Sequence, residues 1–317
     1  MKRQEAFIDA KKMLKGGLHC HTTRSDGRGT PEEVLKMHAD NGYDFLAVTD
    51  HRFYNYANYG ESPLIIVPGM ELDGSLPGNH TRGVHCHHIV CIGPEKEKGN
   101  GFDQDQRFES REFTDPAECQ AMLDMIHANS NLTVYCHPEW SGTPAREFDM
   151  LRGNFAMEIW NSGCVIEDGL DSDNGRVWDE LLIQGQRIYA VATDDGHAMS
   201  QHCNGWVMVN SDANIASILD SLENGRFYAS CGPVIKDFYV SDGQAHVECS
   251  EAVEVQFRHQ YVPYHLVQPH EGEGTITSAS IQLKKSCGPQ YIRAIVKDKQ
   301  GRKAWTNPIW LDDTDFI

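Results

Sequence analysis

The stretch GLHCHTTRSDG holds residue types that could bind a metal ion. It places His19 and His21 two residues apart, with Asp26 five residues further on. Side chains two residues apart on a strand point to the same side, and two imidazoles on one face are a common beginning of a metal site. For this stretch by itself, a pair of solvated histidines is the alternative.

The same residue types return at the ends of later apolar runs. Histidines scattered over a surface would not follow those ends so regularly. Because the carboxyl ends of the strands of a β/α barrel converge on one mouth, where catalytic residues lie, we expect these side chains to share a site. They are Asp50 and His51 in VTDH, Glu71 in PGME, His87 and His88 in HHIVCIG, His137 in YCHP, and Asp194, Asp195 and His197 in ATDDGH.

Strand-like and helix-like segments alternate along the part of the chain that carries these residues. Thr30 can cap a helix that begins at Pro31, and Glu33 can complete a capping box. Repeated strand–helix units predict a mainly parallel sheet or barrel. Short apolar runs predict strands over 16–20, 44–50, 63–72, 87–93, 132–138, 155–161, 187–195 and 206–210. Helical patterns predict helices over 31–41, 116–129, 176–184 and 213–224.

The pattern changes after Gly232 and Pro233. VIKDFYVSDG, AVEVQFRHQ and QYIRAIVKDKQGR alternate with the strand period and are separated by turn residues. This tail predicts a small antiparallel β-sandwich domain. We therefore predict two domains, an α/β barrel over 1–231 and a β domain over 232–317.

Composition restricts the partners. The 317 residues carry a formal net charge of −18, with no basic cluster, which argues against a nucleic-acid polymer. Bound cations would reverse the sign locally, so small phosphorylated substrates stay compatible. No apolar run is long enough for a membrane span, and the first residues lack the apolar block of a secretory signal, so we expect a cytoplasmic protein without membrane contact. The ten cysteines form no CxxC pair.

Taken in order, HCHTTRSDG, TDH, PGME, HHIVCIG, CHP and DDGH resemble the motifs of the PHP family, named for a domain shared by DNA polymerases and histidinol phosphatase. The resemblance covers about residues 1–230 and implies an α/β fold, a distorted, TIM-like (β/α)7 barrel. It also implies an amidohydrolase-like trinuclear centre with up to three divalent metal ions. The tail resembles the appended domain of the CehA-like branch, which is described mostly as phosphoesterases.

The resemblance also implies a ligand set. Asp195 is preferred to Asp194 because the family motif is Asp-x-His, and His88 is preferred to His87 because the family's histidine directly precedes the apolar run; His85 is a further candidate. The implied metal ligands are His19, His21 and Asp195 for the first ion, Glu71 as a bridge to the second, His88 and His137 for the second, and Asp26, His51 and His197 for the third.

These residue types favour Zn²⁺, Mn²⁺ or Fe²⁺ over Ca²⁺. A bound metal lowers the pKa of water from about 15.7 to about 7. We expect a metal-dependent phosphoric ester hydrolase that cleaves a small phosphomonoester or phosphodiester with a metal-bridged hydroxide. The residues expected to carry catalysis are His19, His21, Glu71, Asp195 and His197.

Substrate contacts are expected from loops that follow the strands. Arg24, Arg52 and Arg146 could hold a phosphate with their planar guanidinium groups, and Asn161 could reach the substrate from a strand end. Solvated arginines are the alternative. The leaving-group proton could come from metal-bound water or from a spare imidazole such as His87 or His202.

Two other functions fit the same residues. The hydroxide could attack a carboxylic ester, carbamate or amide, or the protein could be a metal-binding module without catalysis. A polymerase-associated nuclease is disfavoured by the acidic charge. The sequence leaves open the substrate, the native metal, the oligomeric state and the role of the β tail.

Overall fold

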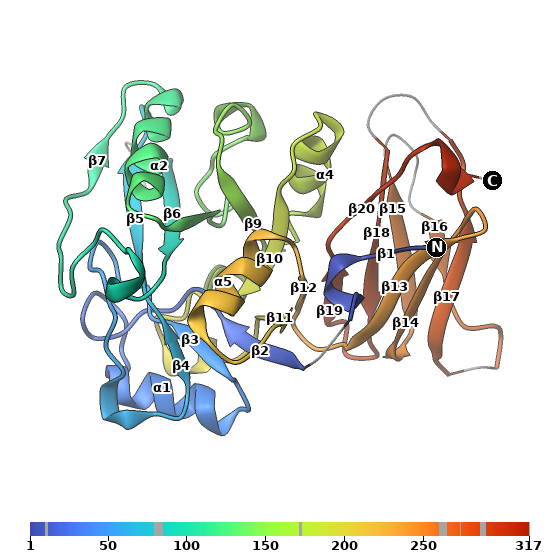
Figure 1. The fold of residues 1–317 in the computed structure, drawn as a ribbon, viewed down its shortest axis with the longest axis horizontal. Helices are drawn as coiled ribbons and strands as arrows, with labels where there is room; N and C mark the ends of the chain where they lie inside the picture. The colour runs from blue at the N-terminus through green and yellow to red at the C-terminus, as the bar shows by residue number, and fades with distance from the viewer. Residues whose placement is uncertain are drawn as a thin grey trace.

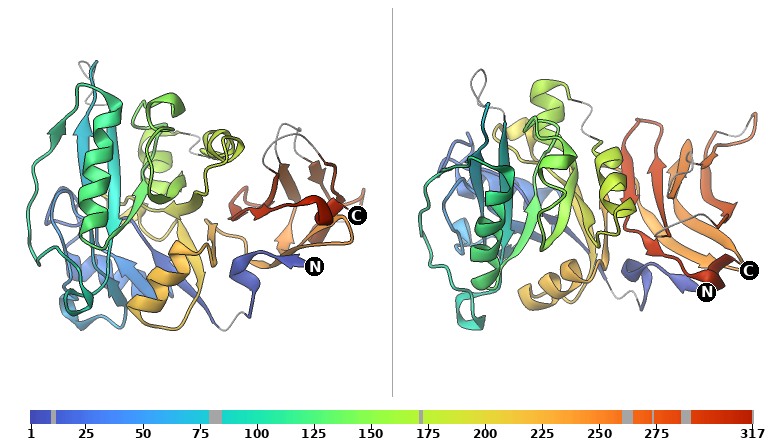
Figure 2. Two further views of the ribbon diagram at one scale, coloured as in Figure 1. Left: turned by 45° about the horizontal axis from the view of Figure 1, so that its top comes forward. Right: turned by 90° about the horizontal axis from the view of Figure 1, so that it is seen from above.

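The computed structural model describes residues 1–9, 12–78, 85–170, 173–259, 265–272, 274–285 and 290–316. The predicted mixed α/β class is confirmed. The labelled α-helices lie in one part of the molecule, and the C-terminal strands gather at the opposite end together with both chain termini (Figure 1). Both views in Figure 2 keep the same separation. No helix among the described residues is long and apolar enough to cross a membrane.

The predicted helices form close to their expected bounds. Thr30 caps the first of them, where its hydroxyl accepts a hydrogen bond from the Glu33 amide and the Glu33 carboxylate accepts one from the Thr30 amide. One short helix, α3, was not predicted; it follows β9 (Asn154–Asn161) directly and is only seven residues long. The helices are α1 (Pro31–Asp40), α2 (Cys119–Ala128), α3 (Ser162–Asp168), α4 (Gly175–Ile183) and α5 (Ile215–Glu223).

A six-stranded sheet forms one side of the α/β part, in the order β10-β9-β8-β6-β5-β7. Strands β8, β9 and β10 are parallel, as predicted, but β6 is antiparallel to both β5 and β8. No predicted helix separates β5 from β6, and strands joined without a crossover pair antiparallel. The strands are β5 (Gly69–Ser75), β6 (Cys86–Ile92), β7 (Arg111–Glu112), β8 (Leu132–Tyr135), β9 (Asn154–Asn161) and β10 (Tyr189–Thr193).

A ten-stranded sheet forms the other side and continues into the C-terminal strands. Its N-terminal members are β2 (Met13–Gly17), β3 (Phe45–Ala47), β4 (Ile65–Val67), β11 (Trp206–Asn210) and β12 (Phe227–Ser230). Its C-terminal members are β15 (Glu254–His259), β16 (His265–Val267), β18 (Tyr291–Lys297), β19 (Lys303–Thr306) and β20 (Ile309–Trp310).

The two sheets enclose a common core. Isolated bridges, Cys20 to Gly196 and His51 to Glu71, connect them where the strands end. The continuous strand pairings of the described residues do not close into one ring, so the predicted barrel is not confirmed. One buried apolar cluster takes side chains from both sheets: Leu14, Phe45, Val67, Val90, Val134, Ala156, Val191 and Val207.

The tail is antiparallel β structure, as predicted. Phe238 and Val247 from the four-stranded sheet share a buried cluster with Phe257 and Ala294 from the ten-stranded sheet. The predicted boundary at residue 231 falls between β12 and β13, yet β12 pairs with β19 across it. The two-domain division and the sandwich stay predictions. The four-stranded sheet consists of β1 (Lys2–Arg3), β13 (Ile235–Ser241), β14 (Gln244–Ala252) and β17 (Ile276–Gln282).

Candidate metal centre

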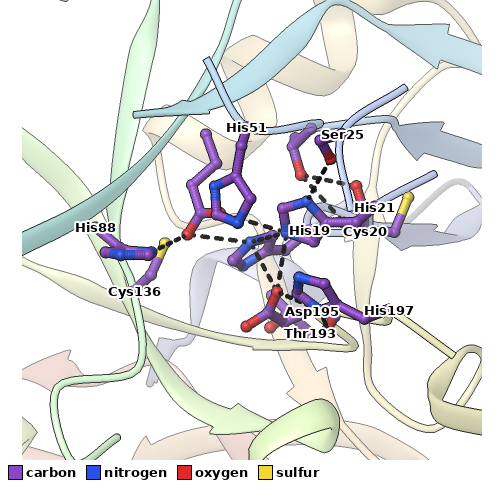
Figure 3. Close-up of polar contacts among 12 residues, drawn as sticks. His19, Cys20, His21, Ser25, His51, His88, Cys136, Thr193, Asp195 and His197 are labelled. Carbon is purple, nitrogen blue, oxygen red and sulfur yellow. Dashed lines mark hydrogen bonds and ion pairs between the residues drawn. The ribbon is translucent and has the colours of Figure 1, made fainter. Parts of the chain in front are cut away.

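The structure brings all of the predicted metal ligands together at one end of the common core. Figure 3 labels His19, His21, His51, His88, Asp195 and His197, whose side chains turn toward one another. Most lie just beyond the carboxyl ends of strands, since β2, β3, β8 and β10 each end within a few residues of a ligand. His88 instead lies in the first half of β6, because β6 runs in the opposite direction to β8 and so begins beside the end of β8.

Strand alternation separates the candidate histidines near β6. His88 faces the centre, where its Nδ1 lies 2.8 Å from Glu71 Oε1. The His87 Nδ1 lies 2.7 Å from the Tyr135 hydroxyl on the other face of the sheet, and His85 pairs with Glu147 at 2.7 Å. His88 therefore has the geometry of a ligand, and the other two have partners elsewhere.

The first group of ligand atoms has the spacing of a coordination shell. His19 Nε2 lies 3.2 Å from His21 Nε2 and 3.2 Å from Asp195 Oδ1, and His21 Nε2 lies 3.0 Å from the same oxygen. Ligands about 2.0–2.1 Å from a tetrahedral zinc ion lie roughly 3.3–3.4 Å apart. With Glu71, these residues form a buried cluster whose ligand atoms all lie within 4.8 Å of one another.

Glu71 connects this group to the remaining ligands. Its Oε1 lies 3.4 Å from His19 Nε2 and 3.4 Å from His137 Nε2, and its Oε2 lies 2.9 Å from His51 Nδ1. A third group forms at the open side around Asp26, whose oxygens lie 3.5 Å from His51 Nε2 and 3.4 Å from His197 Nε2. The carboxylates thus face imidazoles from several strands at once.

Several of these atoms are buried without a hydrogen bond. Glu71 Oε2, Asp195 Oδ1 and His51 Nδ1 have no hydrogen-bonding partner among the described residues. Buried polar atoms of folded proteins are nearly always paired, because an unpaired one loses its hydration without compensation. Their mutual spacing fits divalent cations, which would satisfy these oxygens and nitrogens together.

The buried charges shift one another's pKa values. Burial by itself would lower the pKa of His21, but the negative carboxylates of Asp195 and Glu71 beside its Nε2 outweigh burial and raise the pKa to about 9. Burial would raise the pKa of Glu71, but the nearby imidazoles, His19 first, hold it well below its ordinary value of 4.5. The carboxylate is therefore negative at neutral pH and needs a positive charge beside it, from protons or from metal ions.

A buried carboxylate that the sequence motifs did not single out supports the centre. Glu158 Oε1 accepts hydrogen bonds from His19 Nδ1 at 2.7 Å and from the Thr193 hydroxyl at 2.6 Å. Its Oε2 accepts hydrogen bonds from the His137 amide and from the Asn161 side chain, each at 2.9 Å. A partner of this kind fixes the tautomer and ring orientation of a ligating histidine. The sequence feature that could have identified Glu158 is its charge inside the apolar run FAMEIWN.

Asn161 is also buried inside this network. Its amide donates a hydrogen bond to Asp195 Oδ2 at 3.0 Å, and its side-chain oxygen caps α3 by accepting one from the Cys164 amide. The structure therefore gives Asn161 a positioning contact with a candidate ligand.

The centre opens onto a cavity of about 410 Å³, where Trp140 packs edge-on against His88 and His137. Arg28 is the one cationic side chain other than histidine among its described lining residues, and Glu167 and Asp168 also line it. Asp26 and His51 are shared with a neighbouring hollow.

The predicted arginines lie at different distances from the centre. Arg24 and Arg52 line the neighbouring hollow, where Arg24 pairs with Asp105 at 2.8 Å and Arg52 pairs with Asp73. Arg146 lies on an exposed loop beside another hollow, next to His85 and Glu147. The structure does not bring Arg146 to the centre, because the loop after β8 turns away before it reaches residue 146.

No protein-family model matches the chain, and no curated protein matches it. Solved structures do. One is a two-domain protein containing a predicted PHP-like metal-dependent phosphoesterase from Bacteroides vulgatus, with 13% identity over 98% of this chain and 97% of that chain and a TM-score of 0.46. Another is an amidohydrolase from Chromobacterium violaceum with bound sulfate, with 15% identity over 67% of this chain and 96% of that chain and a TM-score of 0.43.

Both TM-scores are below 0.5. The function proposed below therefore depends on the geometry of the centre. The solved structures that the chain resembles do include a PHP-like protein, the family that the sequence motifs resemble.

Proposed function

We propose that the protein is a metal-dependent hydrolase that cleaves a small phosphomonoester or phosphodiester. The observation that carries this proposal is the buried group of imidazoles and carboxylates with unpaired ligand atoms, which opens onto a cavity. A small molecule fits a cavity of this size better than a nucleic-acid polymer, which the charge of −18 also disfavours.

We further propose that the two sheets form a distorted barrel and that the tail forms a separate sandwich domain. The common apolar core and the two bridges beside the centre support the barrel. The cluster shared by two antiparallel sheets supports the sandwich.

The ligands fall into three neighbouring groups that could hold three divalent ions. When bound, Zn²⁺, Mn²⁺ or Fe²⁺ would lower the pKa of a bound water molecule and polarise a phosphoryl oxygen. The groups are His19, His21, Glu71 and Asp195; Glu71, His88 and His137; and Asp26, His51 and His197.

The remaining residues would bind and orient the substrate. Glu158 orients His19, and Trp140 packs edge-on against His88 and His137 at the cavity. Arg28 reaches the cavity, and Arg24 and Arg52 lie in the adjoining hollow, where guanidinium groups could bind the anionic part of a substrate.

One observation favours the second candidate, hydrolysis of a carboxylic ester, carbamate or amide. Glu167 and Asp168 line the same cavity as Arg28, and negative side chains there would repel a phosphomonoester dianion more than a neutral carbonyl compound.

The two candidates differ in the substrates that they predict. Protein loaded with Mn²⁺ would be tested against phosphomonoesters, phosphodiesters, cyclic phosphates and carboxylic esters, with Glu71→Gln as the inactive comparison. We expect turnover of a phosphate ester, and in ¹⁸O-labelled water a single turnover should place one label in the phosphate. Turnover confined to carboxylic esters would support the second candidate instead, and full activity of metal-free protein would contradict both.

A further inference from the structure

A second buried group of metal-ligating residues lies behind the candidate centre. It consists of His38 on α1, Asp194 at the end of β10, and His202 in the loop before β11, and their ligand atoms all lie within 4.8 Å of one another. Asp194 and Asp195 are consecutive residues that follow β10, yet their side chains belong to different groups of candidate ligands. Asp195 faces the centre, while Asp194 accepts backbone hydrogen bonds from Cys203, Asn204 and Gly205.

The ring of His38 is oriented as a ligand. Its Nδ1 lies 2.8 Å from the Val34 carbonyl oxygen, which can only accept, so Nδ1 carries the proton. In a neutral ring the lone pair is then on Nε2, which lies 3.5 Å from Asp194 Oδ2 and makes no hydrogen bond. A lone pair facing a carboxylate is unfavourable unless a cation lies between them, and an N–H bound to a carbonyl is the usual outer contact of a metal-bound histidine.

His202 has two unpaired ring nitrogens, whereas His38 has one. It is 3% exposed, and neither of its ring nitrogens has a hydrogen-bonding partner among the described residues. The ring packs so closely on Gly196 that a Cβ at that position would lie 2.4 Å from Nδ1.

We propose that His38, Asp194 and His202 bind an additional divalent transition-metal ion, separate from the candidate centre. Two imidazoles and a carboxylate suit Zn²⁺, Mn²⁺ or Fe²⁺. A proton on His38 would pair with Asp194 but would leave both nitrogens of His202 unpaired, whereas one cation would bind one nitrogen of each histidine. The ion would connect α1 to the loop before β11, directly behind Asp195.

Counting bound zinc tests this site. Wild-type protein, His38→Gln and His202→Asn would be loaded with Zn²⁺, passed through gel filtration and analysed for zinc per chain. We expect each variant to hold one zinc ion fewer than the wild type and to melt at a lower temperature. His127→Gln is the matched control, because His127 occupies the last turn of α2 as His38 does in α1 but contacts the Thr133 hydroxyl, and its zinc count should not change.

A second measurement does not depend on the folding of the variants. Anomalous diffraction from wild-type crystals loaded with Zn²⁺ should show a peak about 2.0–2.2 Å from His38 Nε2 and Asp194 Oδ2. Asp195→Asn should weaken the peaks of the candidate centre and leave this one in place, which separates the two proposals. The absence of this peak, or equal zinc counts in the wild type and both variants, would overturn the inference.

Discussion

The candidate metal centre and the ion-pair network around Asp179 are both buried, but their carboxylates have different surroundings. Asp179 Oδ1 accepts hydrogen bonds from the Tyr291 hydroxyl and Arg293 Nε, each at 2.9 Å, and Oδ2 accepts two from Arg258 at 2.6 and 3.0 Å. In the centre, by contrast, one oxygen of Glu71 and one of Asp195 have no hydrogen bond.

The difference indicates what each group does. Asp179 lies on α4 and its partners lie on β15 and β18, so the network holds a helix against the C-terminal strands with every carboxylate oxygen paired. Such a group needs nothing further, and we interpret it as structural. In the centre, ligand atoms stay unpaired and so are available to bind ions. Burying them without partners lowers the stability of the fold.

Replacement of Glu71 should have the largest effect on the centre. Glu71→Gln removes a negative charge that faces ligands of more than one ion. We expect activity to fall at least about 100-fold, with fewer metal ions bound per chain. Glu147→Gln is the control, because Glu147 also pairs with a histidine, His85, but outside the centre. Equal metal content in both variants would show that Glu71 is not a shared ligand.

Replacement of Asp179 should act on stability instead. Asp179→Asn leaves the fully buried Arg293 without its charged partner, and breaking a buried pair in this way costs about 3–5 kcal/mol. Urea unfolding measures the loss, and activity per folded molecule should not change. Asp220→Asn, in the exposed pair with Arg226, should cost less than about 1 kcal/mol. A similar loss for both would contradict the structural interpretation of Asp179.

Glu158 lies between these two cases, because it is a paired carboxylate inside the centre. Glu158→Gln keeps the size of the side chain but weakens its hydrogen bond with His19 Nδ1. We expect metal affinity to fall about 10- to 100-fold, with less effect than Glu71→Gln. Isothermal titration with Mn²⁺ measures the affinity. If neither Glu158→Gln nor Thr193→Val changed the affinity for Mn²⁺, Glu158 would have no role in positioning the ligands.

The smallest effect is a pH dependence of the Asp179 network. Burial would raise the pKa of Asp179, but Arg293 and Arg258 outweigh it and hold the pKa below its ordinary value of 3.8. A lowered folded pKa contributes stability that is fully present above 3.8 and is lost as pH falls through the folded value. The stability difference between wild type and Asp179→Asn should therefore be constant near pH 7 and shrink below pH 3.8. A difference that grows in acid would contradict this assignment.

The elements and the grouping of the candidate ligands could be predicted from the sequence, because both depend on local patterns. The strand-end histidines converge as expected, and alternation along β6 accounts for His88 facing inward while His87 faces Tyr135. Long-range features were less accessible. The antiparallel course of β6 depends on how β5 and β6 are connected, and the position of Arg146 depends on where its loop turns. The charge of Glu158 stands out in FAMEIWN, but its role depends on which face of β9 meets the centre.

The pairing of distant strands has a consequence for synthesis of the chain on the ribosome. β2 pairs with β11, β12 pairs with β19, and β1 pairs with β13, so early strands meet partners that are translated much later. Asp195 and His197 emerge well before β19, which completes the ladder beside β12. Contacts between residues so far apart in sequence slow folding, typically to milliseconds or seconds. His19 and His21 therefore stay without part of their ligand set until Asp195 and His197 have been synthesised.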